Sequence, residues 1–286
     1  MSVSTHLLSG DRAQALRALD GDAATRVIVI TGQGKNFCAG IDVGYLQRNF
    51  ASLVGPSPAP SAAAAAPAAA ACPGTQRAAM RRSILALQDA YSELERCRSP
   101  VIAAVHGRCI GGGVDLITAC DLRIASQDAS FCVKEVDLAI AADLGTLQRL
   151  PHIVGHGVAM DLALTARTVG ADEAQRLGLV SSVVPLAAAA PGAGGGGRAA
   201  VVAAALRLAG GLATKPQLAV QGTKRVLLQA RDQPRVSDGL DYVATWNSAQ
   251  LLSADLAAAM RGPAAAGTAG TAGTAGGAGK AARSRL

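Results

Sequence analysis

The sequence predicts an α/β fold in which short buried strands are joined to amphipathic helices. Half of the 286 residues are hydrophobic, which is enough to form a substantial core. Residues 101–105 (VIAAV) are a short apolar run after Pro100, as expected of a strand that is covered on both faces. Residues 81–96 instead have helical spacing. The apolar face of this helix carries Ile84, Leu87, Tyr91 and Leu94. Aromatic residues make up only 2% of the chain, so alanine, valine and leucine must fill the core.

The first part of the chain predicts one helix and one strand, followed by an insert. Residues 12–19 (RAQALRAL) are expected to be helical and residues 26–31 (RVIVIT) to form a strand. Residues 54–76 or thereabouts are a low-complexity insert of alanine, proline and serine. Its apolar part is too short and too interrupted by proline to span a bilayer, so we expect disorder and no membrane span.

Three successive glycines follow the strand at 101–105. Gly111, Gly112 and Gly113 permit backbone angles closed to other residues and let a ligand approach the main chain. A helix that starts here directs unpaired N–H groups and the positive end of its dipole at whatever lies above the turn. The turn is therefore either an ordinary connection between a strand and a helix or a site for an anion. The glycines alone leave both interpretations open.

Three carboxylates lie near this turn in the sequence. Asp115 falls in the first turn of the expected helix, Glu135 follows the strand-like residues 131–133, and Asp143 ends the apolar run 138–142. Such surroundings desolvate a carboxylate, raise its pKa and suit it to proton transfer. Each of the three, taken singly, is equally consistent with a helix cap or a surface charge, and Asp143 is a candidate N-cap for the helix that follows it.

Charge, cysteines and histidines narrow the range of functions. The net charge of +7 comes from scattered lysines and arginines, which favours a phosphate-rich ligand and, without interleaved aromatics, does not indicate nucleic acid. The six cysteines form no CxxC pair and no cluster with histidine, so we expect free thiols and no metal site. The four histidines form no triad with a serine, and His106 is expected to be a packed turn residue.

The second half of the chain predicts mainly helices. The expected elements are helices at 155–166 and 171–177, a strand at 179–184, a flexible loop at 191–197 and a largely helical segment at 198–260.

Three motifs resemble the enoyl-CoA hydratase/isomerase (crotonase) superfamily. They are KNFCAGID at 35–42, SPVIAAVHGRCIGGGVDLITACDLRIAS at 99–126 and ADEAQRLGLVSSVVP at 171–185. The resemblance extends from about residue 26 to residue 260, apart from the insert. It implies an α/β fold with a ββα superhelix (spiral) core and a C-terminal helical region that packs around a trimer.

The same resemblance implies the substrate and the groups that bind it. In this family two backbone N–H groups form an oxyanion hole for the thioester carbonyl of an acyl-CoA, and they match Ala39 and Gly112 of this chain. The substrate-binding residues that it implies are Ala39, Gly40, Ile41, Asp42 and Gly112. CoA is part of the substrate, and no separate cofactor is expected.

The acidic positions resemble one branch of the family, the Δ3,5-Δ2,4-dienoyl-CoA isomerases. Hydratases have Glu at the positions of both Asp115 and Glu135, whereas this chain has Asp at the first and also carries Asp143. The run VKEVDLAIAADLGTLQRLP at 133–151 and the segment 215–247 are similar to the same branch. The resemblance implies isomerisation of 3,5-dienoyl-CoA to 2,4-dienoyl-CoA in the β-oxidation of unsaturated fatty acids, with these three acids as catalytic residues.

Two alternatives stay open. A 2-enoyl-CoA hydratase would use Asp115 and Glu135 to deliver water, and turnover of crotonyl-CoA would reveal it. A catalytically impaired acyl-CoA-binding homologue, or a structural subunit, would follow from the N-terminus, which is shorter than in the family by about one strand unit. Tight binding of a CoA ester without turnover would mark the impaired homologue, and absence of binding would mark the structural subunit.

The expected domains are a core at 1–198, a helical region at 199–261 and a disordered tail at 262–286. The tail is a tract of glycine, threonine and alanine that ends in Ser284, Arg285 and Leu286. SRL is a conservative variant of the SKL address, so we expect a peroxisomal import receptor as a partner and the peroxisome as the location, with the mitochondrion as the alternative. A homo-oligomer, trimeric or hexameric, is the other expected partnership.

Overall fold

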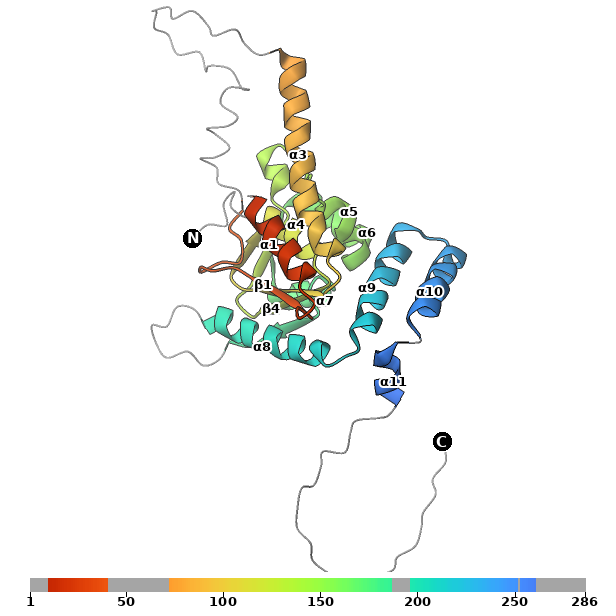
Figure 1. Ribbon diagram of the computed structural model, residues 1–286. Helices are drawn as coiled ribbons and strands as arrows, with labels where there is room; N and C mark the ends of the chain where they lie inside the picture. Colours follow the sequence, from red (N-terminus) through yellow and green to blue (C-terminus); the bar gives the residue numbers. More distant parts are fainter. Residues whose placement is uncertain (1–9, 41–71, 187–195, 252, 261–286) are drawn as a thin grey trace, which may run out of the picture.

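The computed structural model describes residues 10–40, 72–186, 196–251 and 253–260 (Figure 1). Its centre is a parallel four-stranded sheet with the order β1-β2-β4-β7. The strands are β1 (Ile28–Thr31), β2 (Val101–Val105), β4 (Leu122–Ser126) and β7 (Ser182–Val184). All five residues of β2 are buried, because this strand is central and both faces of the sheet are covered. The strand predicted at 101–105 is confirmed.

A second, three-stranded sheet lies beside the first and carries the glycine turn. Its order is β3 (Arg108–Ile110), β5 (Ser130–Cys132) and β6 (Val169–Gly170), with β3 and β5 parallel and β5 and β6 antiparallel. Cys38 joins β3 by two hydrogen bonds, from its N–H to the Arg108 oxygen at 2.9 Å and from the Ile110 N–H to its own oxygen at 3.0 Å. This pairing brings the first family motif alongside the second.

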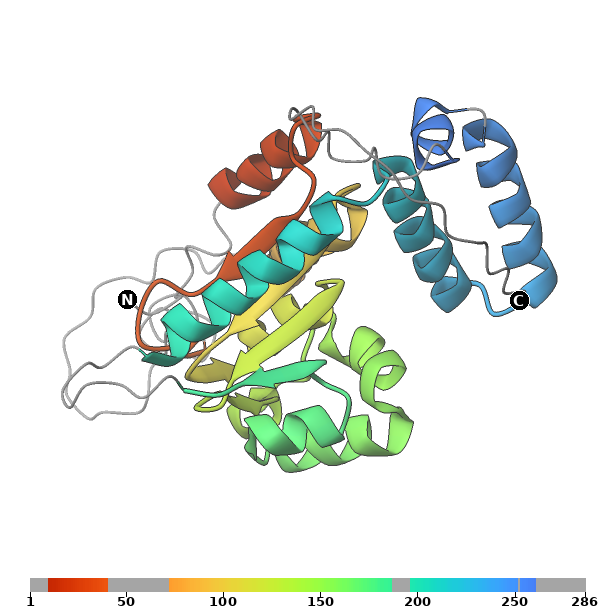
Figure 2. The same cartoon turned by 90° about the horizontal axis from the view of Figure 1, so that it is seen from below.

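The two faces of the central sheet are covered by different helices. Helix α8 (Gly196–Ala213) lies along one face, where its Val201 and Ala205 pack against Ile102, Ala104 and Ile124 (Figure 2). The opposite face contacts α3 (Pro73–Arg96) and α4 (Gly112–Thr118). Side chains of β2 alternate between these two clusters, as a strand requires. The expected domain boundary at 198/199 is therefore wrong, because it falls inside a helix that belongs to the core.

By length and composition, α8 is the one helix in the described part of the chain that would suffice to cross a bilayer. Its buried valine and alanine lie on the sheet, so we interpret it as a covering helix of the core.

Helix α3 (Pro73–Arg96) begins eight residues before the predicted start. Pro73 occupies a first-turn position, where its missing N–H costs no intrahelical hydrogen bond. The residues that follow, from Gln76 to Met80, are good helix formers. The expected insert is therefore too long at its C-terminal end, because Pro73 and Gly74 are typical of a loop although proline is also tolerated in the first turn of a helix. Residues 54–71 of the insert lie outside the described residues, as do the tail at 262–286 and most of the loop at 191–197.

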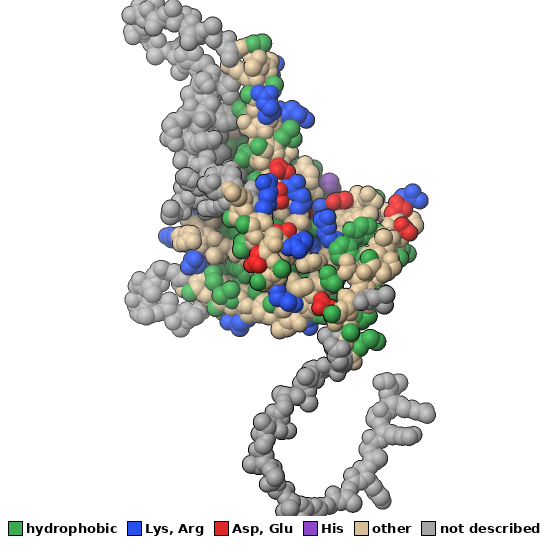
Figure 3. Space-filling model, in the orientation of Figure 1, with side chains coloured by type: hydrophobic (Ala, Val, Ile, Leu, Met, Phe, Trp, Pro, Cys, Tyr) green, Lys and Arg blue, Asp and Glu red, His purple; other side chains and the backbone are tan. Residues whose placement is uncertain are grey.

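Ion pairs connect α1 (Gly10–Gly21) to α3 and to the segment after it. Arg17 pairs with Glu93 at 2.9 Å, and Arg98 pairs with Asp20 at 3.6 Å. Figure 3 shows Lys and Arg side chains interspersed with acidic ones over this face. Pairs as exposed as these contribute less than about 1 kcal/mol each.

Two other predictions of local structure are confirmed. His106 is buried, and its Nε2 hydrogen-bonds to the Gly34 carbonyl oxygen at 3.0 Å. All six cysteines are free.

The C-terminal helices project from the core beyond α8, as Figure 1 shows. They are α9 (Gln217–Asp232), α10 (Val236–Gln250) and α11 (Ala254–Met260), which confirms the predicted helical segment. Helices α9 and α10 pack closely enough that a Cβ on Gly222 would overlap the indole of Trp246.

Lys224 anchors α9 to the core. Its Nζ pairs with Asp121 at 2.7 Å and donates to the Leu94 oxygen at 3.1 Å, and the residue is only 7% exposed. Asp121 in turn accepts the Val101 N–H at 2.8 Å, at the start of the central strand. One buried ammonium thus connects α9, α3 and β2.

We expect Lys224→Ala to lower the free energy of unfolding by about 3 kcal/mol, because it leaves the Asp121 carboxylate buried without its countercharge. Urea or thermal unfolding measures this loss. Lys215→Ala is the matched control, since Lys215 is exposed, and it should be neutral. Equal stabilities of the two variants would contradict the anchoring role.

Candidate active site

The glycine turn between β3 and α4 is shaped by two close approaches. Gly111 has a φ of +54°, a left-handed conformation that favours glycine. Its N–H donates to the Cys132 oxygen at 2.9 Å. A Cβ on Gly111 would lie 3.1 Å from Oε1 of Glu135, and a Cβ on Gly113 would lie 2.6 Å from the Cβ of Cys38. The turn therefore packs against both Glu135 and the segment that contains Ala39.

Ala39 and Gly112 border this turn with their N–H groups available. Within the described residues, neither N–H donates to a protein acceptor. Gly112 opens α4, where a helix leaves its first N–H groups unpaired. Of the three glycines, only Gly111 has a positive φ, so the unusual backbone angle expected of the whole turn is confined to that residue. Ile41 and Asp42, the other expected substrate contacts, lie outside the described residues.

Asp115 is the most deeply buried of the three expected carboxylates. It is 1% exposed, and its Oδ1 accepts the N–H of Thr146 at 2.7 Å. Burial raises the pKa of Asp115, while the hydrogen bonds from Thr146 act in the opposite direction. The negative field of Asp143 raises it further and the positive field of Arg149 lowers it. Its contact with Thr146 ties the start of α4 to the start of α5 (Thr146–Val154).

Glu135 is the carboxylate whose pKa is raised to near neutrality. It begins the 3₁₀ helix η2 (Glu135–Leu138), shortly after the end of β5 at Cys132, and is 8% exposed. Burial, assisted by the negative charge of Asp115, raises the pKa of Glu135 to about 7. Its Oε2 is buried and has no hydrogen-bond partner among the described residues. A carboxylate with an unpaired buried oxygen and a pKa near neutrality is suited to accept or return a proton.

Asp143 lies on the loop before α5, with its side chain exposed. The residue that caps α5 is Gly145, so the interpretation of Asp143 as an N-cap is wrong. Partial burial nevertheless raises the pKa of Asp143, and its charge is felt at both Asp115 and Glu135. The structure thus brings the three acids into one electrostatic cluster beside the glycine turn.

Tyr91 is a fourth polar group at the turn, and it was not predicted as a residue of the site. The predicted helix placed Tyr91 on the apolar face, and the residue is indeed buried there. Its hydroxyl lies 3.0 Å from where a Cβ on Gly112 would be. Burial, together with the charges of Asp115 and Glu135, raises the pKa of Tyr91, so the phenol stays protonated at neutral pH.

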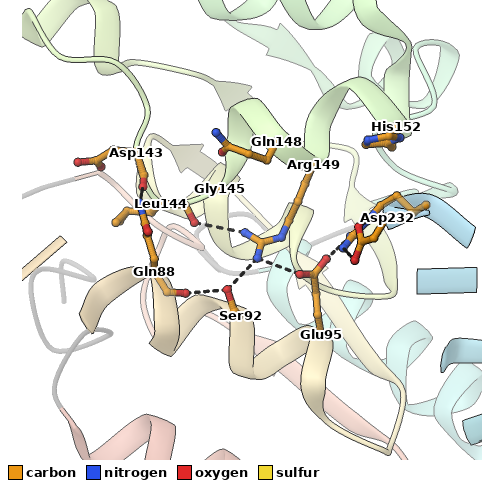
Figure 4. Close-up of a pocket in the computed structure, with 11 residues that line it drawn as sticks. Gln88, Ser92, Glu95, Asp143, Leu144, Gly145, Gln148, Arg149, His152 and Asp232 are labelled. Atoms are coloured by element: carbon orange, nitrogen blue, oxygen red, sulfur yellow. Dashed lines mark hydrogen bonds and ion pairs between the residues drawn. The ribbon is translucent and has the colours of Figure 1, made fainter. Parts of the chain in front are cut away.

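A polar cavity of about 350 Å³ adjoins Asp143 on the side of α5 (Figure 4). Its lining comes from α3, the loop 143–145, α5 and α9: Gln88, Ser92, Glu95, Asp143, Leu144, Gly145, Gln148, Arg149, His152, Arg231 and Asp232. The charged groups are largely paired, with Arg149 and Glu95 in contact at 2.9 Å and Arg231 and Asp232 at 2.7 Å.

The raised pKa of Glu135 predicts a stability that depends on pH. Folding favours the protonated form, so this contribution is fully present below the unfolded pKa of about 4.5 and is lost as the pH rises through about 7. We therefore expect Glu135→Gln to unfold at a higher temperature than wild type at pH 8, by the equivalent of about 1 to 3 kcal/mol, and at nearly the same temperature at pH 4. Thermal unfolding at the two pH values measures this. An equal effect at both would contradict the raised pKa.

Comparison with known proteins identifies the family. The model of the enoyl-CoA hydratase/isomerase family matches residues 72–240. The chain is 48% identical to the peroxisomal Delta(3,5)-Delta(2,4)-dienoyl-CoA isomerase of Arabidopsis thaliana, over 85% of this chain and 78% of that protein. It is 41% identical to the mitochondrial Delta(3,5)-Delta(2,4)-dienoyl-CoA isomerase of Homo sapiens, over 86% of this chain and 67% of that protein.

Solved structures give the same assignment. The fold is similar to that of an enoyl-CoA hydratase from Bacillus anthracis, with a TM-score of 0.71 and 28% identity, covering 91% of this chain and 86% of that one. The expected crotonase-like α/β fold is confirmed. The chain therefore belongs to the enoyl-CoA hydratase/isomerase family.

Proposed function

We propose that this protein converts 3,5-dienoyl-CoA to 2,4-dienoyl-CoA. The observation that supports this most strongly is the cluster of Asp115, Glu135 and Asp143 beside the available N–H groups of Ala39 and Gly112. Two relatives that cover most of the chain are named for this reaction. The conversion removes a proton from C2 and adds one at C6, so the atoms and electrons balance without a redox cofactor.

The N–H groups of Ala39 and Gly112 stabilise the charge that forms. Loss of the C2 proton leaves its bonding electrons delocalised from the thioester oxygen to C6. The oxygen is then an anion between two N–H donors at the positive end of α4. Each such donor is typically responsible for about 3 to 4 kcal/mol of barrier lowering.

Glu135 takes the C2 proton in this mechanism. It lies against Gly111, next to the thioester oxygen site, and C2 is bonded to the carbon of that thioester. A pKa of about 7 makes it both an adequate base and an adequate acid near neutral pH. Asp143, on the more exposed loop, donates the proton to C6. Asp115 keeps the pKa of Glu135 high by its negative charge.

A 2-enoyl-CoA hydratase is the second candidate, since a crotonyl-CoA hydratase of Syntrophomonas wolfei is 34% identical over 73% of this chain. Hydration needs two carboxylates that both reach a water molecule. Asp115 is 1% exposed and already accepts the Thr146 N–H, which disfavours that role. We expect crotonyl-CoA to be turned over far more slowly than a 3,5-dienoyl-CoA.

The direct test is an assay of the purified protein with 3,5-octadienoyl-CoA, following the ultraviolet absorbance of the conjugated 2,4-dienoyl product. Binding of the CoA ester without product would instead support the impaired homologue. Rapid hydration of crotonyl-CoA without isomerisation would support the hydratase.

Assembly and location complete the proposal. The C-terminal helices expose large apolar side chains, which a second copy of the chain would cover in a trimer or hexamer. They are Leu227, Val236, Leu240, Leu251 and Met260. Light scattering after gel filtration measures the assembly.

The peroxisome is the proposed location, since one close relative is named as peroxisomal, and the mitochondrial relatives supply the alternative. The SRL signal lies outside the described residues.

We expect Asp143→Asn to lower isomerisation by at least about a hundredfold, because an amide of the same size cannot donate the proton to C6. Exchange of C2 deuterium with solvent should continue, since it needs only Glu135 and the oxyanion hole. Mass spectrometry of recovered substrate measures the exchange, and ultraviolet absorbance measures the product. Wild-type isomerisation by this variant would refute the assignment of Asp143.

We expect Gly112→Val to lower turnover by about a hundredfold or more, consistent with loss of one oxyanion donor. The added side chain would meet the Tyr91 hydroxyl, which lies 3.0 Å from the first added carbon, and would move the N–H from its target. The backbone angle at residue 112 is not itself strained, so the variant should fold. Circular dichroism checks folding. A folded variant with near-normal turnover would move the active site elsewhere.

A further inference from the structure

The loop that carries Asp143 is held at three backbone points by three different elements. Gln88 of α3 donates to the Asp143 oxygen at 2.6 Å. Arg149 of α5 donates to the Leu144 oxygen at 3.3 Å. The Thr146 N–H donates to Asp115 of α4 at 2.7 Å. The side chain of Asp143 makes no hydrogen bond to a described residue, so the position of its carboxylate depends on this backbone.

Arg149 is the charged member of this set and is itself held in a buried network. It is 9% exposed, and its Nη2 donates to Ser92 Oγ at 3.1 Å and to Glu95 Oε2 at 2.9 Å, as the dashed lines of Figure 4 show. The second oxygen of Glu95 pairs with Arg231 of α9. Because both Glu95 oxygens are engaged, the carboxylate that binds Arg149 is itself held in place.

Gly145 fits the Arg149 guanidinium closely. Its φ is +123°, and a Cβ on it would overlap the Arg149 guanidinium. The guanidinium therefore packs directly on the backbone next to Leu144. The Arg149 guanidinium lies against both the Leu144 carbonyl and Gly145, so it blocks movement of the loop toward α5.

We propose that Arg149 is a positioning residue for the isomerisation, holding the loop 143–146 so that Asp143 reaches C6 of the diene. The inference rests on the proposed function. Arg149 touches no reacting atom and acts through the loop backbone. Its loss should therefore slow the proton transfer at C6 much more than the proton transfer at C2.

The test compares these two proton transfers in Arg149→Met. A displacement of about 1 Å can cost about a hundredfold in rate, so we expect isomerisation of 3,5-octadienoyl-CoA to fall by that order. Exchange of deuterium from C2 of the same substrate should fall much less than isomerisation, because Arg149 does not contact Glu135 or the oxyanion hole and reaches Glu135 only through its field at Asp115. The KM should change little.

Two further variants complete the comparison. Arg149→Lys retains the charge but lacks the planar fork that spans Leu144, Ser92 and Glu95, so it should restore only part of the isomerisation rate. Arg231→Met removes the other partner of Glu95 and leaves every contact between Arg149 and the loop in place, so it should lower the isomerisation rate much less than Arg149→Met does.

The outcomes separate this inference from the proposed function. Absence of isomerisation in the wild-type protein would refute the function itself. Given wild-type isomerisation, equal losses of isomerisation and C2 exchange in Arg149→Met would show a general structural role, and no loss would show none; either result overturns the inference. If Arg149→Met does not fold, Arg149→Lys decides: selective loss of isomerisation supports the inference, and a full rate contradicts it.

Discussion

The hydrogen bond from the Thr146 N–H to Asp115 is the contact on which the site depends. It lies in the core, it joins the first turn of α4 to the first residue of α5, and at 2.7 Å it is short for an N–H donor. Gly112, the oxyanion donor of the glycine turn, lies three residues before Asp115, and Asp143 lies three residues before Thr146. One buried hydrogen bond of Asp115 therefore helps to position both the oxyanion donor Gly112 and the proton donor Asp143.

That carboxylate also sets the electrostatics. Burial disfavours the negative charge of all three acids, the charge of Asp143 raises the pKa of Asp115 and Glu135, and the charge of Asp115 raises the pKa of Glu135. Asp115 is favoured to hold a charge because Thr146 donates to it and Arg149 lies nearby. Glu135 has an Oε2 with no partner among the described residues, and burial and the charge of Asp115 destabilise its ionised form, so its pKa is near neutrality.

The parts of the site that the sequence predicted are local in the chain. The strand at 101–105, the glycine turn and Asp115 follow one another, and their pattern is visible in a single stretch. Tyr91 and Arg149 were not predicted as site residues, because their partners are distant in the sequence. Tyr91 lies against Gly112, more than twenty residues away, and Arg149 binds Glu95, more than fifty residues away. The start of α3 was missed for a different reason: Pro73 and Gly74 are typical of a loop, although proline is also favoured in the first turn of a helix.

Glu95 connects the active site to the surface that would mediate assembly. One of its oxygens binds Arg149, which holds the loop of Asp143, and the other binds Arg231 near the end of α9. Helix α9 packs on α10, whose residues are all at least partly exposed in the single chain. Any partner that covers these helices would restrict α9 at Arg231 and Lys224, the two points where α9 is paired with acids of the core. The geometry of the proton donor and the fit of the C-terminal helices thus share one carboxylate, so the two cannot vary independently.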